Sequence, residues 1–381
     1  MPWDAPIVSN EEKEAVWTAY HGRKPIRVPV TIATNPRVFV LNPALNRKNI
    51  TFRQVFEDPA AMFEAALEHE LYRRTVIHKY CDSPVGIPEE WTVGVSWQNT
   101  YEAAFFGAIW DFRDGQVPDV KPFLDAGNKE RIFDVDIDHP LDGGIFRRGL
   151  KFYEEMRRLA SGYAFHGRPV KVARYAQTGT DGPLTIAMSV RGTEFLSDMI
   201  LDPDYAERLL DFITDAAIKR AYAFRKHWGD EEMGVSLADD SIQLISADMY
   251  RKMVMPRHRR FYDEFLREKP RHIHLCGDVM RHLKVLKDEL NVMSFDTGFP
   301  VDFARIRKEL GPDVEVYGGP NISLLLRAAP QEVYDETCRI LESGIKEGGR
   351  FILREANNLP PCVPEHNLAA MYKACLDKGR Y

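Results

Sequence analysis

The sequence lacks the features that mark membrane, secreted and nucleic-acid-binding proteins. None of its 381 residues fall in an uncharged apolar window of the ~18 residues that a membrane span requires. Its start has no basic segment followed by an apolar core, so we expect no signal peptide. The formal net charge is −6 at pH 7 without any long basic run, which argues against non-specific nucleic-acid binding.

Cysteine is also scarce. The chain has five cysteines, which are widely scattered: Cys81, Cys276, Cys338, Cys362 and Cys375. An odd number without regular spacing is typical of a reducing compartment and not of a disulfide framework. We therefore expect a cytoplasmic protein.

Short β-rich runs alternate with longer helical stretches along the chain, a pattern that indicates βα units around a parallel sheet. The predicted strands are Val28–Ala33, Val93–Trp97, Val170–Gln177, Met233–Leu237, His272–Leu275, Val292–Phe295, Val314–Tyr317 and Arg350–Leu353. Eight such runs predict one (β/α)8 barrel over residues 1–381. A doubly wound open sheet is the competing topology.

Apolar residues at helical spacing predict seven helices. They are Pro59–Tyr80, Gly192–Trp228, Ala247–Glu268, Val279–Leu290, Val301–Leu310, Pro330–Glu347 and Pro364–Lys378. The region of about 100–150 breaks this rhythm, and we interpret it as a long βα insertion in the N-terminal half. Four aromatic residues in or beside it, Trp97, Tyr101, Phe105 and Trp110, either wall an apolar substrate pocket or form a small satellite core.

The strongest local motif is the segment 271–278, which reads as a buried strand that ends in a turn. Side chains alternate faces along a strand, so His272, His274 and Cys276 share one face. Facing into a barrel, His274 and Cys276 approach its C-terminal rim together and could form half of a zinc site. A packed cysteine beside a hydrogen-bonded histidine is the alternative.

Polar side chains follow several other predicted strands, where barrel enzymes place acids, bases and ligands. Asp240 and Asp296 could each complete a metal shell, bind a substrate or donate a proton. Asn321, Glu355 and Asn357 follow the last two strands and are candidates for substrate binding, although Asn is also common in tight turns. The sequence has no Walker loop, no Rossmann fingerprint and no Gly-x-Ser-x-Gly elbow.

The ordered set of C-terminal motifs resembles the uroporphyrinogen decarboxylase superfamily, especially its corrinoid-dependent methyltransferase branch. The segment His272–Asp278 resembles the family's His-x-Cys-Gly strand, and Asp296 falls where the family has an Asp after the next strand. Residues 316–321 resemble its Gly-Asn strand end, and residues 351–368 resemble its C-terminal segment. The resemblance implies a (β/α)8 barrel. True decarboxylases carry an N-terminal Arg-Gln-Ala-Gly-Arg-Tyr signature that this sequence lacks.

In the methyltransferase branch, zinc is held by a His, a Cys two positions later, and a Cys near the end of the last strand. His274 and Cys276 match the first two ligands. Asn357 stands where the third is expected, and Cys362 lies several residues later. Cys362 could still reach the site, or Asp240, Asp296 or Glu355 could supply an oxygen ligand instead. A site richer in oxygen ligands suits a Lewis acid that polarises an ether or amine leaving group.

We therefore expect a metal-assisted methyltransferase that moves a methyl group between a small methylated molecule, for example a methoxylated aromatic, and a corrinoid protein. The corrinoid would arrive on a partner, because the chain has no Asp-x-His-x-x-Gly cobalamin pattern. The family also makes a homodimer plausible. One alternative is a decarboxylase or other lyase of a non-porphyrin acid, with Arg27, Arg37 or Arg174 on the carboxylate and Asp240 as the acid. Another is a non-catalytic ligand-binding barrel. Metal content distinguishes methyl transfer from both.

Overall fold

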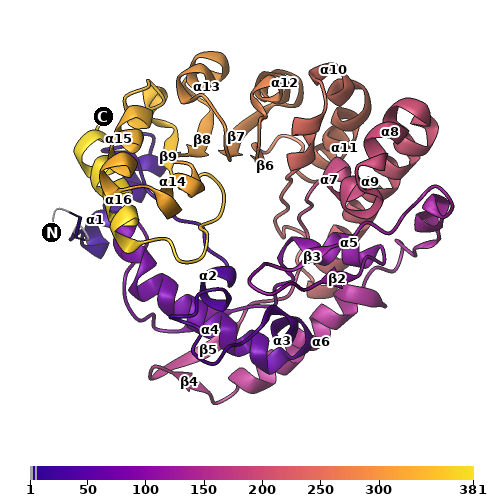
Figure 1. The fold of residues 1–381 in the computed structure, drawn as a ribbon, viewed down its shortest axis with the longest axis horizontal. Helices are drawn as coiled ribbons and strands as arrows, with labels where there is room; N and C mark the ends of the chain where they lie inside the picture. The colour runs from indigo at the N-terminus through magenta and orange to yellow at the C-terminus, as the bar shows by residue number, and fades with distance from the viewer. Residues whose placement is uncertain (1–2, 5–6) are drawn as a thin grey trace.

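The chain folds into a ring of helices around short parallel strands (Figure 1). The computed structural model describes residues 3–4 and 7–381. Four strands pair in parallel and in chain order: β6 (Arg271–Leu275), β7 (Val292–Thr297), β8 (Glu315–Gly318) and β9 (Phe351–Leu353). Their carboxyl ends therefore lie on one rim.

The remaining neighbours continue this ring. β1 (Trp91–Val93) pairs in parallel with β5 (Arg168–Val172). The predicted strands Val28–Ala33 and Met233–Leu237 take part through isolated parallel bridges instead of regular strands: Val30 with Leu353, Leu237 with Thr180, and Ala238 with His274. The predicted (β/α)8 barrel is confirmed, and the open sheet is excluded.

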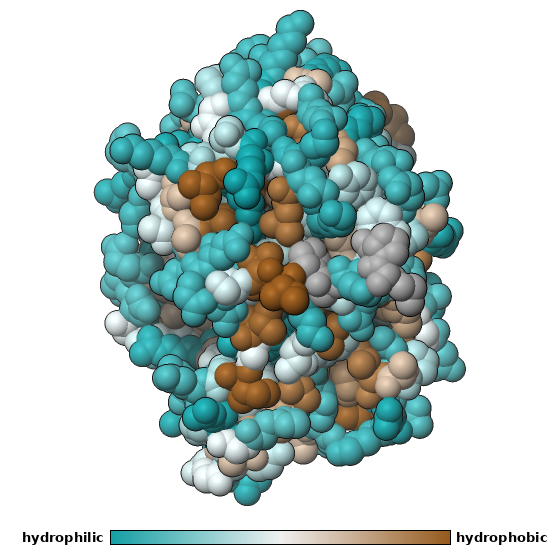
Figure 2. All heavy atoms as spheres, turned by 90° about the vertical axis from the view of Figure 1, so that its left-hand side faces the viewer, coloured by the Kyte–Doolittle hydropathy of each residue, from teal (hydrophilic) through white to brown (hydrophobic). Residues whose placement is uncertain are grey.

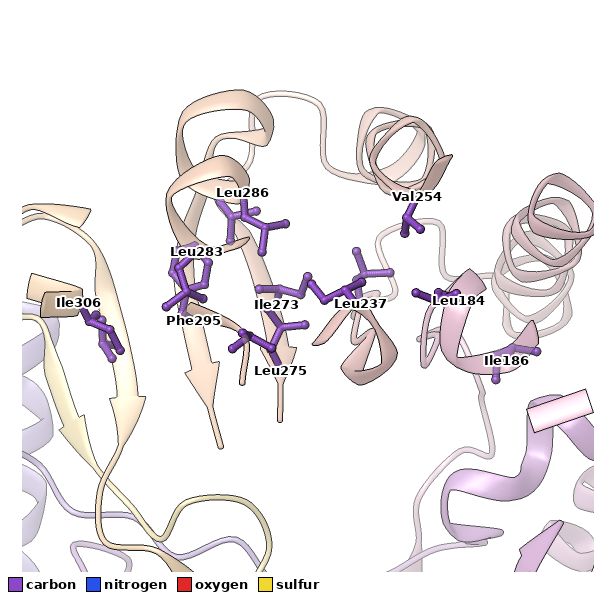
Figure 3. Close-up of a cluster of buried hydrophobic side chains, with 14 of the residues drawn as sticks. Leu184, Ile186, Leu237, Val254, Ile273, Leu275, Leu283, Leu286, Phe295 and Ile306 are labelled. Carbon is purple, nitrogen blue, oxygen red and sulfur yellow. The ribbon is translucent and has the colours of Figure 1, made fainter. Parts of the chain in front are cut away.

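The barrel strands bury one face against the helices and turn the other inward. In β6, Arg271, Ile273 and Leu275 are buried, whereas His272 and His274 are partly exposed. Figure 3 shows Ile273 and Leu275 within a cluster that includes Leu283 and Leu286 of α12 (Met280–Leu290). Because this apolar face is fixed against the helix layer, the two histidines face the inside of the barrel.

Most predicted helices are present with shifted ends, namely α4 (Pro59–Thr75), α13 (Phe303–Leu310), α15 (Pro330–Leu341) and α16 (Glu365–Lys378). The prediction of one continuous helix over Gly192–Trp228 is wrong. It is divided into α8 (Glu194–Leu201) and α9 (Pro203–Trp228), because Asp202 caps α9 and Pro203 takes its first turn. The predicted helix Ala247–Glu268 is likewise divided into α10 (Ala247–Met249), a π-helical turn η5 (Tyr250–Val254) and α11 (Met255–Phe265).

Three long helices were not predicted: α1 (Asn10–His21), α6 (Gly144–Ala160) and α7 (Pro183–Arg191). Between β1 and α6, the chain forms α5 (Tyr101–Phe105) and a hairpin of β2 (Trp110–Asp111) with β3 (Asp119–Val120). The other short elements are α2 (Arg37–Val40), α3 (Phe52–Glu57), α14 (Ile322–Arg327), β4 (Ala164–Phe165), η1 (Ile77–Tyr80), η2 (Gln98–Thr100), η3 (Lys129–Asp134), η4 (Asp240–Leu244) and η6 (Glu347–Gly349).

Two hydrophobic clusters support the molecule. The larger one packs the helices around β6–β9 and includes residues from α7, α9 and α12. The smaller one lies under the N-terminal half and gathers apolar residues of α3, α4 and α6 around β1 and β5. Phe105 packs against both clusters.

Hydrophilic side chains cover most of the face that carries α1, α15 and α16, and apolar groups interrupt them in separate patches (Figure 2). Among the described residues, no helix combines the length and the apolar character that crossing a bilayer requires.

His69 on α4 makes the stability of the fold sensitive to acid. Its side chain is 6% exposed, and Nε2 lies 3.0 Å from Thr34 Oγ1. Burial, helped by the charge of Arg73, lowers the pKa of His69 to about 3. The unfolded chain therefore takes up a proton at His69 that the folded chain excludes, and stability present above pH ~6.5 is lost as the pH falls.

We expect His69 to account for a loss of about 2 kcal/mol of unfolding free energy between pH 7.5 and 5. Urea unfolding of the wild type and of His69→Gln, which keeps a hydrogen-bonding side chain, measures this contribution. The glutamine variant should lose less stability over the interval. Parallel stability curves for the two proteins would show that His69 does not titrate as described.

Candidate active site

The carboxyl ends of neighbouring strands bring the predicted metal-binding and acidic side chains together. Ala238 pairs with His274, and His274 pairs in turn with Asp296 on β7. Asp240 and Cys276 each lie two residues beyond this row. The parallel register thus places Asp240, Cys276 and Asp296 on adjacent strand ends at one rim of the barrel.

Asp240, His274 and Cys276 form a cluster that could hold one metal ion. One ligand atom from each lies within 4.8 Å of the others. Cys276 Sγ is 3.3 Å from His274 Nε2. The Cys276 main-chain N–H donates to Asp240 Oδ1 at 2.7 Å, which fixes that carboxylate beside the thiol. Within the described part of the chain, no second group of three such side chains is close enough to share an ion.

The opposite edge of the His274 ring is held by Asp296. His274 Nδ1 lies 2.8 Å from Asp296 Oδ2, and Arg354 Nη1 donates to the same oxygen at 2.6 Å. The second carboxylate oxygen, Asp296 Oδ1, is buried and has no hydrogen-bond partner among the described residues. Asp296 therefore orients the ring and leaves Nε2 directed at Cys276, which is the arrangement of a histidine prepared for a metal.

The charges of the cluster are strongly coupled. Burial alone would lower the pKa of His274, but its contacts with Asp296 and Cys276 raise it to about 11. Burial opposes ionisation of Asp296 as well, yet His274 and Arg354 lower its pKa. Burial raises the pKa values of Asp240 and Cys276. The raised pKa values mean that Asp240, His274 and Cys276 tend to keep their protons, which a bound cation would displace.

The geometry of these residues fits zinc. Tetrahedral zinc takes thiolate at ~2.3 Å and imidazole at ~2.1 Å, which puts the two ligand atoms about 3.6 Å apart. The observed separation of Sγ and Nε2 is 3.3 Å, so a small movement opens the required space. A carboxylate from Asp240 completes three protein ligands, the number usual in catalytic zinc sites, which keep one position open.

Asp181 is a site residue that the sequence analysis did not single out. It follows Thr180, which pairs with Leu237 on the strand beside Asp240. Its main-chain N–H donates to Glu102 at 2.6 Å, and no hydrogen bond to its side chain is present among the described residues. Burial, with the nearby charges of Glu102 and Asp240, raises the pKa of Asp181 to about 8. Its sequence context, Thr-Gly-Thr-Asp-Gly-Pro, resembles an ordinary turn and gave no distinguishing signal.

A buried network behind the site anchors the loop that carries Asp240. The preceding residue, Asp239, is fully buried and accepts hydrogen bonds from the Thr185 main chain and hydroxyl at 2.8 and 2.7 Å. His258 Nε2 lies 3.0 Å from the same carboxylate, and His258 Nδ1 lies 3.1 Å from the Tyr250 hydroxyl. These contacts attach the strand end to α7 and α11 and so limit the movement of Asp240.

The predicted aromatic residues are largely packed in the smaller cluster. Trp97 has no exposed surface and stacks on Trp110, with ring centroids 5.6 Å apart. Tyr101 is buried and donates from its hydroxyl to Gly179 O at 3.1 Å. Phe105 is partly buried against Phe146. The satellite-core interpretation describes Trp97 well, and substrate contact by these residues stays a prediction.

Two of the remaining predicted residues, Glu355 and Asn357, contact Arg354. Glu355 is fully buried, accepts from Arg354 Nη2 at 3.0 Å and from the Ala33 N–H at 3.0 Å, and burial raises its pKa to about 8. The carbonyl of Asn357 accepts from Arg354 Nη2 at 2.7 Å. Asn321 caps α14 through its side chain. Cys362 is exposed and lies outside the Asp240–His274–Cys276 cluster.

Comparison with known proteins identifies the family. A model of the uroporphyrinogen decarboxylase (URO-D) family matches residues 100–377, nearly three quarters of the chain. The chain belongs to this family. The resemblance inferred from the C-terminal motifs is therefore confirmed.

Two curated proteins with sequences similar to this chain are methyltransferases. Methylated-thiol–coenzyme M methyltransferase of Methanosarcina mazei is 30% identical over 197 residues, which cover 51% of this chain and 50% of the relative. Methylcobamide:CoM methyltransferase MtbA of the same organism is 22% identical over 201 residues, covering 52% and 57%. The matches thus span about half the length of these relatives.

A solved structure agrees over almost the whole chain. A methyltransferase from Methanosarcina mazei superposes with a TM-score of 0.64 at 18% identity, covering 97% of this chain and 99% of that one. At this identity the agreement establishes the fold and does not extend to the reaction.

The contact between Asp296 and His274 leads to a prediction about metal affinity. We expect Asp296→Asn to weaken zinc binding by about 10–100-fold, because the ring loses its charged orienting partner while all three ligands stay. Competition with a chromophoric chelator measures the affinity. Asp302→Asn is the matched control, since Asp302 only caps α13 at the surface. Equal zinc affinities of the wild type and Asp296→Asn would contradict an orienting role.

Proposed function

We propose that the chain is a zinc-assisted methyltransferase that moves a methyl group between a small methylated compound and a corrinoid carried by a partner protein. The observation that carries this proposal is the cluster of Asp240, His274 and Cys276 at the barrel rim, with ligand atoms within 4.8 Å of one another. Family membership and the methyltransferase relatives support the same reaction class.

Each side chain at the site has its own role in this proposal. Asp240, His274 and Cys276 hold the metal, and Asp296 keeps Nε2 of His274 directed at it. Zinc bound there supplies a Lewis acid that stabilises the charge left on the donor's heteroatom as the methyl group departs. The bond from the methyl carbon to the donor's heteroatom would break with its electron pair on the heteroatom, and a reduced corrinoid on the partner would supply the pair for the new bond to carbon.

Asp181 supplies the proton that the departing heteroatom needs. Its side chain has no hydrogen-bond partner in the described structure, and its raised pKa keeps a proton available near neutral pH. In this role it replaces Asp240, which is occupied as a metal ligand.

We expect the methyl donor to carry its methyl group on an oxygen atom. Asp240 takes the place of a second thiolate, and a site with a carboxylate ligand is harder and better suited to an ether oxygen than to a thiol. Support comes from Tyr101, whose hydroxyl donates to Gly179 O at 3.1 Å, two residues before Asp181. Phe105 and Trp110 follow Tyr101 in α5 and the β2–β3 hairpin. We propose a methoxylated aromatic compound as the donor on this basis.

The test is methyl transfer to free cobalamin. Zinc-loaded protein is incubated with chemically reduced cobalamin and, separately, with aryl methyl ethers, methylamines and methyl thioethers, and methylcobalamin is followed by its absorbance. We expect methylation from the ethers that disappears when the metal is removed and returns with zinc. Absence of methyl transfer from all three classes would overturn the proposal, and carbon dioxide release from an acid without metal would favour the lyase alternative.

A further inference from the structure

The inside of the barrel is polar in the layer directly below the metal cluster. In the parallel register, His272 of β6 pairs with Ser294 of β7, and Ser294 pairs with Glu315 of β8. Each of the three precedes a buried apolar residue that faces the helix layer, and Figure 3 shows two of these, Ile273 and Phe295. Because bulky apolar side chains usually fill the layers of such a barrel, a polar layer indicates a role other than packing.

The hydrogen bonds in this layer run in one direction. The Ser294 hydroxyl donates to Glu315 Oε2 at 3.0 Å, and Ser294 Oγ lies 2.9 Å from His272 Nδ1. A hydroxyl has a single hydrogen, and the carboxylate takes it. Ser294 Oγ therefore accepts from His272, and Nδ1 of His272 carries a proton.

The far end of this chain of hydrogen bonds cannot reverse its direction. Glu315 Oε1 accepts from the Tyr20 hydroxyl at 2.7 Å and forms an ion pair with Arg350, so the carboxylate is charged and can only accept. The Tyr317 ring packs edge-on against the imidazole of His272, with ring centroids 6.1 Å apart. The orientation of the imidazole is thus fixed before any ligand binds.

The other nitrogen of His272, Nε2, has no hydrogen-bond partner among the described residues. The side chain is partly exposed, and it faces the inside of the barrel. A charged ring would need a carboxylate or carbonyl to accept from Nε2, and the described residues place none there. The ring is therefore neutral, and Nε2 offers a lone pair as an acceptor.

A ligand at the metal cluster can reach this nitrogen. His272 and His274 share one face of β6 and are about 6.6 Å apart along the strand, at roughly 3.3 Å per residue. A benzene ring with substituents at opposite positions bridges such a separation. Ala238 pairs with His274, which puts Ser236 opposite His272, and Ser236 is exposed. Ligands therefore have access to the lower layer.

We propose that His272 is a specificity-determining residue whose Nε2 accepts a hydrogen bond from a hydroxyl group of the methyl donor, on the side of the ring opposite the methoxy group. The donor is then a methoxyphenol and not a simple aryl methyl ether or an acid, because a carboxylate would face the lone pair of Nε2. The placement of the methoxy group at the metal rests on the proposed function, whereas recognition of the hydroxyl by His272 does not.

The test compares 4-methoxyphenol with 4-methoxytoluene, in which a methyl group of similar size replaces the hydroxyl, by calorimetric titration of the zinc-loaded protein. We expect the wild type to bind the phenol about 10-fold more tightly, because the toluene leaves Nε2 without a partner. His272→Phe keeps a flat ring without an acceptor and should bind the two probes within about 2-fold of each other.

Two further variants separate recognition from packing. Ser294→Ala removes the acceptor for Nδ1, so the proton can move to Nε2, and the preference for the phenol should fall. His139→Phe is the matched control, because His139 is exposed and pairs only with Asp136 at the surface. We expect this variant to keep the preference of the wild type.

Equal affinity of the wild type for the two probes, no detectable binding of the phenol, or an unchanged preference in His272→Phe would each overturn the inference. The ratio measured for the wild type decides the matter even if a variant does not fold. Binding needs no turnover, so a preference that depends on His272 in a protein without methyl transfer would reject the proposed function alone.

Discussion

Replacing His274 with alanine and Cys276 with serine together should remove the metal and abolish methyl transfer. The two side chains offer two of the three potential ligand atoms in the Asp240–His274–Cys276 cluster. Structural zinc sites bind with roughly 10–16 kcal/mol over four ligands, so losing two should weaken zinc binding by more than about 10⁴-fold. Elemental analysis after gel filtration should find about one zinc per chain in the wild type and none in the double variant.

The matched control is Cys362→Ser, which changes the exposed cysteine after the last strand. We expect this variant to keep its zinc and its activity, because Cys362 lies outside the cluster. Zinc retained by the double variant would contradict the site. Zinc lost from Cys362→Ser would show instead that the loop after β9 moves inward and supplies a thiolate.

Asp82→Ala should cause the largest loss of stability of any single substitution considered. Asp82 is fully buried and accepts four hydrogen bonds, two from Arg27 at 2.7 and 2.6 Å, one from the Val30 N–H at 2.7 Å and one from the Tyr372 hydroxyl at 2.7 Å. These contacts connect the first barrel strand with α16. Alanine would leave the Arg27 charge buried without a partner, at about 3–5 kcal/mol.

Urea unfolding followed by circular dichroism measures this loss. Glu57→Ala is the control, because Glu57 pairs with Arg53 at the surface, where both side chains are more than half exposed, and should change stability by less than about 0.5 kcal/mol. Removing both charges with Arg27→Met and Asp82→Leu should recover part of the loss. A midpoint for Asp82→Ala within error of the wild type would refute the argument.

The C-terminal half of the fold could be predicted because its signals are local. The strands β6–β9 are short β-rich runs, and α12, α13, α15 and α16 carry regular apolar spacing. The N-terminal half of the fold was harder to predict from sequence. α6 lies directly after an aromatic region with many glycines and prolines, which obscured its start at Gly144. The boundary at Asp202 was lost because apolar residues continue on both sides of it.

The site was predictable only as far as position along a strand allows. Alternation placed His274 and Cys276 on one face, and strand ends indicated Asp240 and Asp296. Which atoms each carboxylate contacts depends on the register between strands. That register places Asp240 in the candidate metal cluster and Asp296 against Nδ1 of His274. Asp181 was not distinguishable by sequence, because what marks it is burial without a hydrogen bond to its side chain among the described residues, a property that only the folded structure reveals.

The two hydrophobic clusters have a consequence for how this protein could change during evolution. The candidate metal-binding residues lie at strand ends supported by the larger cluster. Trp97, Tyr101 and Trp110 pack in or against the smaller cluster, and Phe105 packs against both. Substitutions in the smaller cluster can therefore reshape what the rim accepts while the metal-binding strands keep their support. We expect laboratory selection for new methyl donors to collect its changes between residues 34 and 146.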